Sequence, residues 1–337
     1  LTDLNGYRSL FEVYRPVLVV TATAGFLPAE VPLIYAAKHF GVPQMGVDLG
    51  WDNLSSKYHT VLPVDHLAVW NETMRVEAVR YHGFEQDRVE VTGPVAFDVY
   101  QHLDGIPTRE QLILSFGGDP TRSLVTLATA PAAVYPTTDR VVEALAEASR
   151  NGELGEGAQL LVRVHPRDAA ELYARFHDGH RVFVEKPFQR LQCGPGVARF
   201  DAFSPGVDDR RRLAATLAHS DVIVNFASTT TIEASLFDTP VVNIGYDDAP
   251  VLNLPLSIAR YYQYEHYQVV VETKAAHRAT SAADLVASVR RYLVEPARDR
   301  EARRELVRRC CGFPVGGASE RLARWVLRTL RQTTVWG

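Results

Sequence analysis

A run of hydroxyl side chains is the first place in this sequence from which chemistry can be inferred. The letters STTT at 228–231 follow an apolar stretch and precede Glu233. If a helix begins here, its free N–H groups attract a phosphate, and Ser228 and Thr229 can donate hydroxyl hydrogen bonds to it. The alternative is a capping box, in which Thr230 caps the helix and Glu233 bonds back to its backbone N–H. One cap needs one hydroxyl, so four favour a ligand.

The stretch LLVRVHPRD carries a second candidate site. His165 ends a predicted strand, and Pro166 removes the next backbone donor, so the chain must turn there. Arg163 shares a strand face with His165 because side chains alternate along a strand. The plain alternative is a strand-end histidine held by a backbone carbonyl. Two cations on one face, in the same half of the chain as the hydroxyl run, predict an anionic ligand.

The first half of the chain has a polar loop around Trp51 that also follows a predicted strand. Asp52 is placed to deprotonate an acceptor hydroxyl while Trp51 stacks on a sugar ring, with Asn53 and Lys57 as further acceptor contacts. An ordinary polar loop with an Asx turn is the alternative. Asp98, just past a later strand, is a second candidate for the catalytic base.

The elements that must position these residues alternate regularly. Short apolar strands are followed by amphipathic helices, a rhythm that predicts βαβ units and parallel sheets. The expected strands are 17–23, 43–49, 66–70, 88–93, 124–130, 159–166, 181–185, 221–226 and 240–246. The expected helices are 29–40, 72–82, 139–150, 168–176, 210–219, 231–237, 282–293, 299–309 and 319–331. In such sheets ligands bind beyond the carboxyl ends of the strands, where the hydroxyl run and His165 both lie.

The run 100–111 interrupts this rhythm with glycine, proline and charge. We therefore expect an α/β protein with two consecutive Rossmann-like, doubly wound domains, over 1–105 and 106–310. Residues 311–337 are expected to form a C-terminal helix that packs across both domains. The chain begins without methionine and reaches its first strong strand almost at once, so we expect the N-terminal domain to be incomplete.

The composition excludes several classes of protein. The 337 residues are 46% hydrophobic with a net charge of −4, which suits a globular protein and gives no sign of nucleic-acid binding. No apolar run reaches the roughly 18 residues that a membrane span needs. Three cysteines without a framework, and no visible signal peptide, predict a reducing, cytoplasmic location. There is no GxGxxG after a strand, no P-loop, no zinc-type spacing and no Asp-x-Asp, so we expect neither a metal nor a cofactor.

The C-terminal tail is rich in arginine and tryptophan. Its two expected helices carry Arg303, Arg304, Arg308, Arg309, Arg324 and Arg328 alongside Trp325 and Trp336. The plain interpretation is that the arginines form solvated helix faces. The alternative is peripheral contact with the anionic inner face of the plasma membrane, where lipid-linked acceptors reside.

Several stretches together resemble a known group of enzymes, the bacterial GT-B-fold glycosyltransferases of surface-carbohydrate assembly. The group is related to CDP-glycerol glycerophosphotransferases, capsule Kdo transferases and polysialyltransferases. The resemblance covers roughly 16–246 and rests on QLLVRVHPRD, DVIVNFASTTTIEASLFDTPVVNIGYD, GWDNLSSK and VWNETMRVEAVRYHGFEQDRVEVTGPVAFD. It implies a donor nucleotide, often CMP or CDP, in the C-terminal domain and an acceptor mostly in the N-terminal one. His165 would contact the donor phosphates, Ser228 and Thr229 would hold them, and Glu233 would bind the ribose diol.

We therefore expect a metal-independent transferase that moves a sugar or polyol-phosphate unit from a nucleotide-activated donor to a glycan or lipid-linked glycan acceptor. His165 and Ser228 would stabilise the departing phosphate, and Asp52 or Asp98 would take the acceptor proton. One alternative is a nucleotide-sugar epimerase of the UDP-N-acetylglucosamine 2-epimerase type, which shares the fold but carries SGG where this chain has STTT. The other is a non-catalytic nucleotide- or glycan-binding relative.

Overall fold

Both predicted halves of the chain are folded. The computed structural model describes residues 4–57, 63–101, 104–187, 206–247, 257–312 and 316–334. The chain divides into two units, each with its own sheet. Unit 1 comprises Leu1–His102, Tyr264–His266 and Arg308–Gly337, and unit 2 comprises Leu103–Gln263 and Tyr267–Val307.

Unit 1 is built on a four-stranded parallel sheet. The strand order is β1 (Val19–Thr21), β2 (Gln44–Val47), β3 (His66–Val69) and β4 (Val89–Val91). Its helices are α1 (Asn5–Tyr14), α2 (Val31–His39), α3 (Asn53–Ser56), α4 (Glu72–His82) and α12 (Ala318–Thr334), with the short 3-10 helices η1 (Gln86–Arg88) and η2 (Val95–Gln101). As expected, Asn71 caps α4 by accepting a hydrogen bond from the Met74 N–H at 3.0 Å.

Unit 2 is built on a six-stranded parallel sheet with the order β10-β9-β8-β5-β6-β7. These strands are β5 (Leu124–Ala128), β6 (Gln159–Arg163), β7 (Val182–Glu185), β8 (Val222–Phe226), β9 (Val241–Ile244) and β10 (His277–Ala279). In order of sequence the sheet has the 3-2-1-4-5-6 arrangement of a Rossmann fold, whose strand order reverses between β5 and β8. Ala128 pairs in register with both Arg163 and Asn225, so the carboxyl ends of β5, β6 and β8 align.

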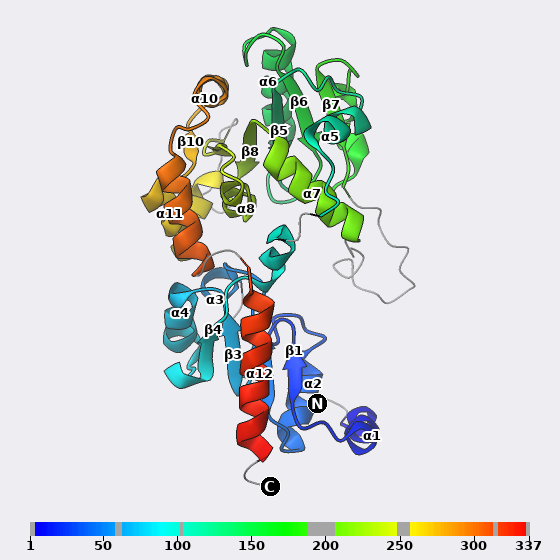
Figure 1. Cartoon of the computed structure of the whole chain (residues 1–337), viewed down its shortest axis with the longest axis vertical. Coiled ribbons are helices and arrows are strands. Elements are labelled where there is room, and N and C mark those ends of the chain that lie inside the picture. Colours follow the sequence, from blue (N-terminus) through cyan, green and yellow to red (C-terminus); the bar gives the residue numbers. More distant parts are fainter. Residues whose placement is uncertain are drawn as a thin grey trace. The chain divides into compact units, whose positions relative to one another are not determined.

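The helices of unit 2 connect these parallel strands. They are α5 (Arg109–Ser115), α6 (Thr138–Arg150), α7 (Val207–His219), α8 (Thr230–Leu236), α9 (Gln268–Thr273) and α10 (Ala282–Val294), with 3-10 helices η3 (Ala170–Leu172), η4 (Ala174–Phe176) and η7 (Ile258–Gln263). Two more elements include residues of both units, η8 (Glu265–Tyr267) and α11 (Arg300–Cys311). In Figure 1 α5 and α7 lie together on the sheet, where Ile113 and Ala215 belong to one buried cluster with Leu124, Leu161 and Phe183. This burial removes apolar surface from water and fixes the sheet that carries the site.

Most predicted elements are confirmed, but α1, α3, α5, α9 and β10 were not predicted, and one predicted helix is replaced for a physical reason. Residues 168–176 do not form the expected helix but the 3-10 helices η3 and η4. The Asp168 carboxylate accepts a hydrogen bond from the Ala132 N–H at 3.0 Å, and Ala169 is extended with φ −83° and ψ 139°. This tertiary contact draws the backbone off a helical path.

The arginine- and tryptophan-rich tail forms the two helices α11 and α12, as expected. Trp325 is 5% exposed and packs with Met45, Val47 and Ala68 of the unit 1 sheet. Arg303 is fully buried, and its guanidinium pairs with Asp238 at 2.7 Å. Neither of these two side chains is therefore placed to contact a membrane.

The remaining members of this group are exposed or undescribed. Arg304, Arg308, Arg309, Arg324 and Arg328 are exposed, and Trp336 lies outside the described residues. No helix in the described part of the chain is long and apolar enough to cross a membrane.

Candidate functional site

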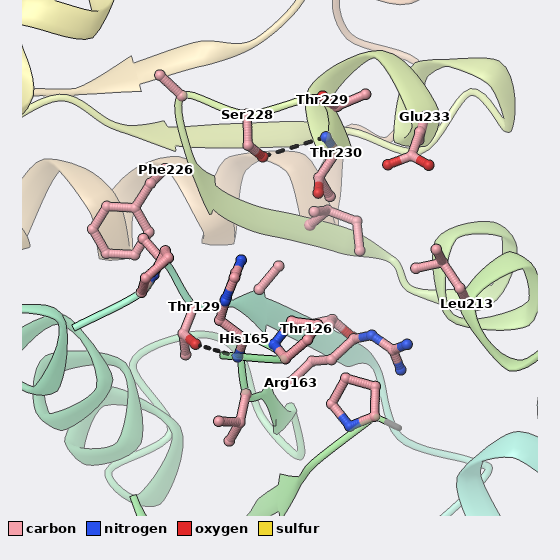
Figure 2. Close-up of a pocket in the computed structure, with 18 of the residues that line it drawn as sticks. Thr126, Thr129, Arg163, His165, Leu213, Phe226, Ser228, Thr229, Thr230 and Glu233 are labelled. Carbon is pink, nitrogen blue, oxygen red and sulfur yellow. Dashed lines mark hydrogen bonds between the residues drawn. The ribbon is translucent and has the colours of Figure 1, made fainter. Parts of the chain in front are cut away.

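A cavity of about 380 Å³ lies at the carboxyl ends of β5, β6 and β8. Its position is the point where the strand order reverses, which is where open α/β sheets bind ligands. All six residues predicted to contact the donor line it, namely Arg163, His165, Ser228, Thr229, Thr230 and Glu233. Figure 2 shows Arg163 and His165 on one side of the cavity and the four others on the opposite side. The structure thus brings together two stretches that are more than sixty residues apart in sequence.

The His165 ring is held in one orientation by the turn that follows β6. Its Nδ1 accepts a hydrogen bond from the Arg167 N–H at 3.1 Å. Its own backbone N–H donates to the Thr129 hydroxyl at 2.8 Å. Burial lowers the pKa of His165 below its usual value, although the charge of Asp168 partly opposes this. At neutral pH the uncharged ring therefore carries its proton on Nε2, where it can donate to a ligand oxygen.

Arg163 brings a positive charge that is largely neutralised within the protein. Arg163 is 7% exposed, and its guanidinium lies 3.1 Å from the Glu185 carboxylate. Arg212 binds the same carboxylate, with Nε 2.7 Å from Oε1. Glu185 balances one of these two charges, and Glu233 on the opposite wall acts on Arg163 with a second negative charge. The Arg163 side chain stays anchored to Glu185 and contributes a positive charge at the edge of the cavity.

The hydroxyl run begins α8 differently from the predicted capping box. Thr229 is the N-cap residue, and its side chain makes no capping hydrogen bond. The Ser228 hydroxyl accepts a weak hydrogen bond from the Thr230 N–H at 3.3 Å. Thr230 is already the first helical residue, so the interpretation of Thr230 as the cap is wrong. Because α8 has only seven residues, its dipole is short, and the hydroxyls themselves are the main donors of this wall.

The fourth hydroxyl, Thr231, faces the protein interior. It is fully buried, and its Oγ1 donates to Asn243 Oδ1 at 3.0 Å and lies 3.4 Å from Asn225 Nδ2. Asn225 in turn accepts a hydrogen bond from the Ser228 hydroxyl at 2.9 Å. Asn243 Nδ2 donates to the Tyr267 hydroxyl at 2.9 Å. This buried network fixes the orientation of Ser228 from behind.

An aromatic wall of the cavity was missed by the sequence reasoning. Phe226 stacks on Tyr135 with ring centroids 4.8 Å apart, and Tyr261 lies 5.3 Å from Tyr135. All three rings line the cavity. The available signal was the position of Phe226, which ends the same strand that leads to Ser228. A sugar or base ring is the kind of group that packs on such a wall.

The residues predicted to contact the acceptor all lie in unit 1 and form a connected polar loop. Asp52 pairs with Lys57, whose Nζ lies 2.8 Å from its carboxylate. Asn53 Nδ2 donates to the buried Asp48 at 2.6 Å. Trp51 is 5% exposed and meets the His266 ring edge-on, with centroids 5.0 Å apart. In this conformation Trp51 is a core residue and does not offer a face for sugar stacking.

Asp98 anchors α12. Its two carboxylate oxygens accept hydrogen bonds from the N–H groups of Ala318 at 3.0 Å and Ser319 at 2.7 Å. Burial acts to raise the pKa of Asp98, but these hydrogen bonds outweigh it and hold the pKa below the usual value. Both oxygens are occupied and the group is a weak base. The contacts of Asp98 thus favour helix capping over proton transfer.

Two buried carboxyl groups of unit 1 were not among the predicted site residues. Burial raises the pKa of Asp48 to about 6, against hydrogen bonds from Gly50 and Asn53. Burial and the nearby charge of Glu265 raise the pKa of Glu77 to about 7. Asp48 Oδ2 and both oxygens of Glu77 are buried without a hydrogen-bond partner in the described part of the chain. In the sequence, Glu77 was recognisable only as a glutamate within an expected helix. Asp48 was recognisable only as an aspartate at the end of an expected strand.

Within the described ranges, no three His, Cys, Asp or Glu side chains are grouped so that they could hold a metal ion. The side chains that line the unit 2 cavity offer donors and an acceptor. A neutral imidazole N–H and several hydroxyls can donate to phosphate oxygens. Glu233, half-buried on the opposite wall, can accept hydrogen bonds from a diol.

Comparison by sequence finds no relatives: no protein-family model matches the chain, and no curated protein matches it. Comparison by structure finds many similar proteins. UDP-GlcNAc 2-epimerase from Neisseria meningitidis, bound to UDP-GlcNAc, is similar with a TM-score of 0.64 and 11% identity over 96% of this chain and 80% of that one. A glycosyltransferase from Rickettsia africae has a TM-score of 0.53 and 11% identity over 98% and 80%. The wall teichoic acid polymerase TagF has a TM-score of 0.50 and 10% identity over 98% and 94%.

Solved structures with sequence identities this low show that the fold is shared, but they do not show that the function is shared. Epimerases and transferases occur among the similar structures, and all share two parallel-sheet α/β domains. The chain therefore has the two-domain α/β fold of the GT-B type.

Proposed function

We propose that this chain is a glycosyltransferase or polyol-phosphate transferase that acts on a nucleotide-activated donor and needs no metal. The donor is CMP- or CDP-linked, and the acceptor is a surface glycan or its lipid-linked precursor. The choice of nucleotide and acceptor rests on the resemblance of the sequence to enzymes of surface-carbohydrate assembly. The reaction takes place on the cytoplasmic side, where nucleotide-activated sugars are available.

The observation that carries the proposal is the unit 2 cavity with its six donor-side residues. His165 offers Nε2–H from one wall, and its ring is fixed before the ligand binds, so it needs no reorganisation when charge develops on the departing phosphate. Ser228 lies on the opposite wall and can donate its hydroxyl to the phosphate by exchanging its hydrogen bond with Asn225. We assign His165, Ser228 and Thr229 to the phosphates, with Thr230 beside them. Glu233 is assigned to the ribose diol, because a carboxylate binds neutral hydroxyls and repels phosphate.

The acceptor needs a base, and unit 1 supplies the candidates. Asp52 is partly exposed and carries Lys57 beside it. Asp98 is occupied by the start of α12, which makes Asp52 the better candidate of the two. A base must lie within hydrogen-bond reach of the acceptor hydroxyl in the working complex.

The test is donor binding and turnover by wild type, His165→Ala and Ser228→Ala. CMP, CDP, UDP, GDP and dTDP are first screened by calorimetry to identify the nucleotide. We expect both variants to bind that nucleotide about tenfold or more weakly, as expected for lost hydrogen bonds to a charged group. His177→Ala is the matched control, because His177 also accepts a backbone hydrogen bond on Nδ1, from Val184 at 3.2 Å, but lies outside the cavity. Unchanged affinity and rate in both site variants would refute the assignment.

A nucleotide-sugar epimerase is the second candidate, favoured by the similarity to the Neisseria epimerase at a TM-score of 0.64. The chain has the hydroxyl run at 228–231 where such enzymes carry a glycine-rich SGG. Incubation of UDP-GlcNAc without acceptor separates the two proposals. Only an epimerase converts the sugar, which NMR spectroscopy detects directly, whereas a transferase leaves it unchanged. Nucleotide binding without either reaction would instead support a non-catalytic relative.

A further inference from the structure

Unit 2 contains a second cavity, of about 310 Å³, that shares no residue with the first. It lies beside the edge strand β10, between α9, the start of β10 and the end of α10. Tyr262, Tyr267 and Tyr292 form its walls. A volume of this size is at the lower end of the range of small-molecule sites.

The second cavity is strongly basic. Its lining includes Lys274, Arg278, Arg291 and Arg298, against a single carboxylate, Asp299. Arg298 pairs with Glu295 at 3.2 Å, and Asp299 accepts a hydrogen bond from the Tyr292 hydroxyl at 2.8 Å. Within the described residues, Lys274, Arg278 and Arg291 form no ion pair with a carboxylate. Three cations therefore face the cavity without neutralisation.

Arg278 is held in place over an aromatic ring. Its guanidinium carbon lies 4.1 Å from the centroid of the Tyr262 ring, a cation–π contact. Gly245 makes room for it, because a Cβ at Gly245 would lie 2.4 Å from the Arg278 Cγ. The Tyr262 hydroxyl is itself fixed by a hydrogen bond to the Ile244 carbonyl at 2.5 Å. Such pre-positioning lowers the entropy lost when the guanidinium binds a ligand.

Lys274 adopts a backbone conformation that lysine rarely takes. Its φ is 55°, in the left-handed region, at the residue that ends α9. This conformation costs a non-glycine residue free energy, and such outliers gather at ligand sites. Glycine or asparagine would end the helix at lower cost. A lysine here places a third cation at the cavity and keeps it in reach of solvent.

We propose that this second cavity binds a small phosphorylated molecule through Lys274, Arg278 and Arg291. Arginine side chains bind phosphate oxygens with paired, charge-assisted hydrogen bonds, and the tyrosine walls suit a ring attached to the phosphate. The site is separate from the donor cavity and does not depend on the proposed transferase reaction. The three cations are exposed, so a ligand reaches them without rearrangement of the fold.

The test uses inorganic pyrophosphate as the probe and hydrogen–deuterium exchange with mass spectrometry as a local readout. We expect pyrophosphate to slow exchange in peptides that cover 268–279 and 288–299. Arg291→Gln and Arg278→Gln should each raise the pyrophosphate concentration for half-protection at least about fivefold, through loss of charge-assisted hydrogen bonds. Arg290→Gln is the matched control, because Arg290 is the exposed neighbour on α10 that does not line the cavity.

Three results would overturn the proposal. Equal effects of Arg290→Gln and Arg291→Gln would mean that the probe responds only to net charge. Loss of protection at 268–299 in His165→Ala/Ser228→Ala would mean that the signal comes from the donor cavity. Equal protection by citrate, a polycarboxylate, would contradict the phosphate class of the ligand. Unchanged melting temperatures of the variants confirm that each result concerns binding and not folding.

Discussion

The backbone N–H of Arg167 lies 3.1 Å from Nδ1 of His165 and donates a hydrogen bond to it. This one contact decides what the imidazole can do. With Nδ1 occupied as an acceptor, the neutral ring must carry its proton on Nε2. Because the donor is a backbone group, the arrangement follows from the His-Pro-Arg turn itself.

His165→Gln and His165→Asn separate the two ring positions. The glutamine amide reaches the region of Nε2 and can still donate to a phosphate, whereas asparagine only replaces Nδ1. We expect His165→Asn to weaken nucleotide binding about tenfold and His165→Gln to weaken it less, as measured by calorimetry. Equal losses in the two variants would show that the ring does not act through Nε2.

Nucleotide binding should depend on pH through the same ring. Burial lowers the pKa of His165 below 6.5, so the ring is neutral at pH 7. Protonation turns Nδ1 into a donor, which opposes the Arg167 N–H and disrupts the turn. We therefore expect nucleotide affinity to be level from pH 7 to 8 and to change only at a pH below 6.5. In His165→Gln this step should be absent, whereas a step that persists would identify another titrating group.

Removal of two adjacent hydroxyls on α8 should affect different properties of the protein, stability for Thr231 and nucleotide binding for Thr230. Thr231→Val leaves Asn225 and Asn243 with unsatisfied buried groups, which should lower the free energy of unfolding by about 1–3 kcal/mol in urea denaturation followed by circular dichroism. Thr230→Val, in the cavity wall, should leave stability nearly unchanged and weaken nucleotide binding. The reverse pattern would show that the ligand side of the helix is wrongly assigned.

Glu77 should make unit 1 less stable as the pH rises. Its pKa is about 7 in the folded chain against 4.5 when exposed, so the folded state binds more protons between these values. The free energy of unfolding should therefore fall between pH 4.5 and 7, by up to about 3 kcal/mol. Glu77→Gln should remove most of this slope. Glu72→Gln, at an exposed position of the same helix, is the control and should retain it.

Tryptophan fluorescence is a suitable measurement for that experiment. Trp51, Trp70 and Trp325 lie in unit 1, and the segments of unit 2 contain no tryptophan, so these three residues report the unfolding of unit 1. An unchanged slope in Glu77→Gln would mean that another group, of which Asp48 is the first candidate, dominates the pH dependence.

Asp98→Ala should act on stability and not on donor binding. The variant leaves the N–H groups of Ala318 and Ser319 without their acceptor at the start of α12. We expect a loss of about 1–2 kcal/mol in the unfolding free energy of unit 1, the usual cost of a lost helix cap. Nucleotide affinity should remain that of wild type. A fall in transfer rate without loss of stability would restore Asp98 as the catalytic base.

Most of the elements and their order could be predicted from the sequence, although the edge strand β10 and the helices α1 and α5 could not. Apolar runs, caps such as Asn71 and the glycines that end helices act over a few residues, so the alternating strands and helices could be predicted directly. The parallel α/β class follows from that alternation. It also places His165 and Ser228 after strands, at the sheet edge where ligands bind.

The side chains of the hydroxyl run that face the cavity could not be predicted from the sequence, because tertiary packing selects them. Ser228 and Thr230 line the cavity, while Thr231 turns inward to Asn225 and Asn243, partners from two different strands. Trp51 and Asp98 were predicted to serve the acceptor, but the His266 ring covers one and the first turn of α12 occupies the other. A local pattern states what a residue can bind. Its actual partners belong to segments that are distant in the sequence, and the packing of the whole unit sets their positions.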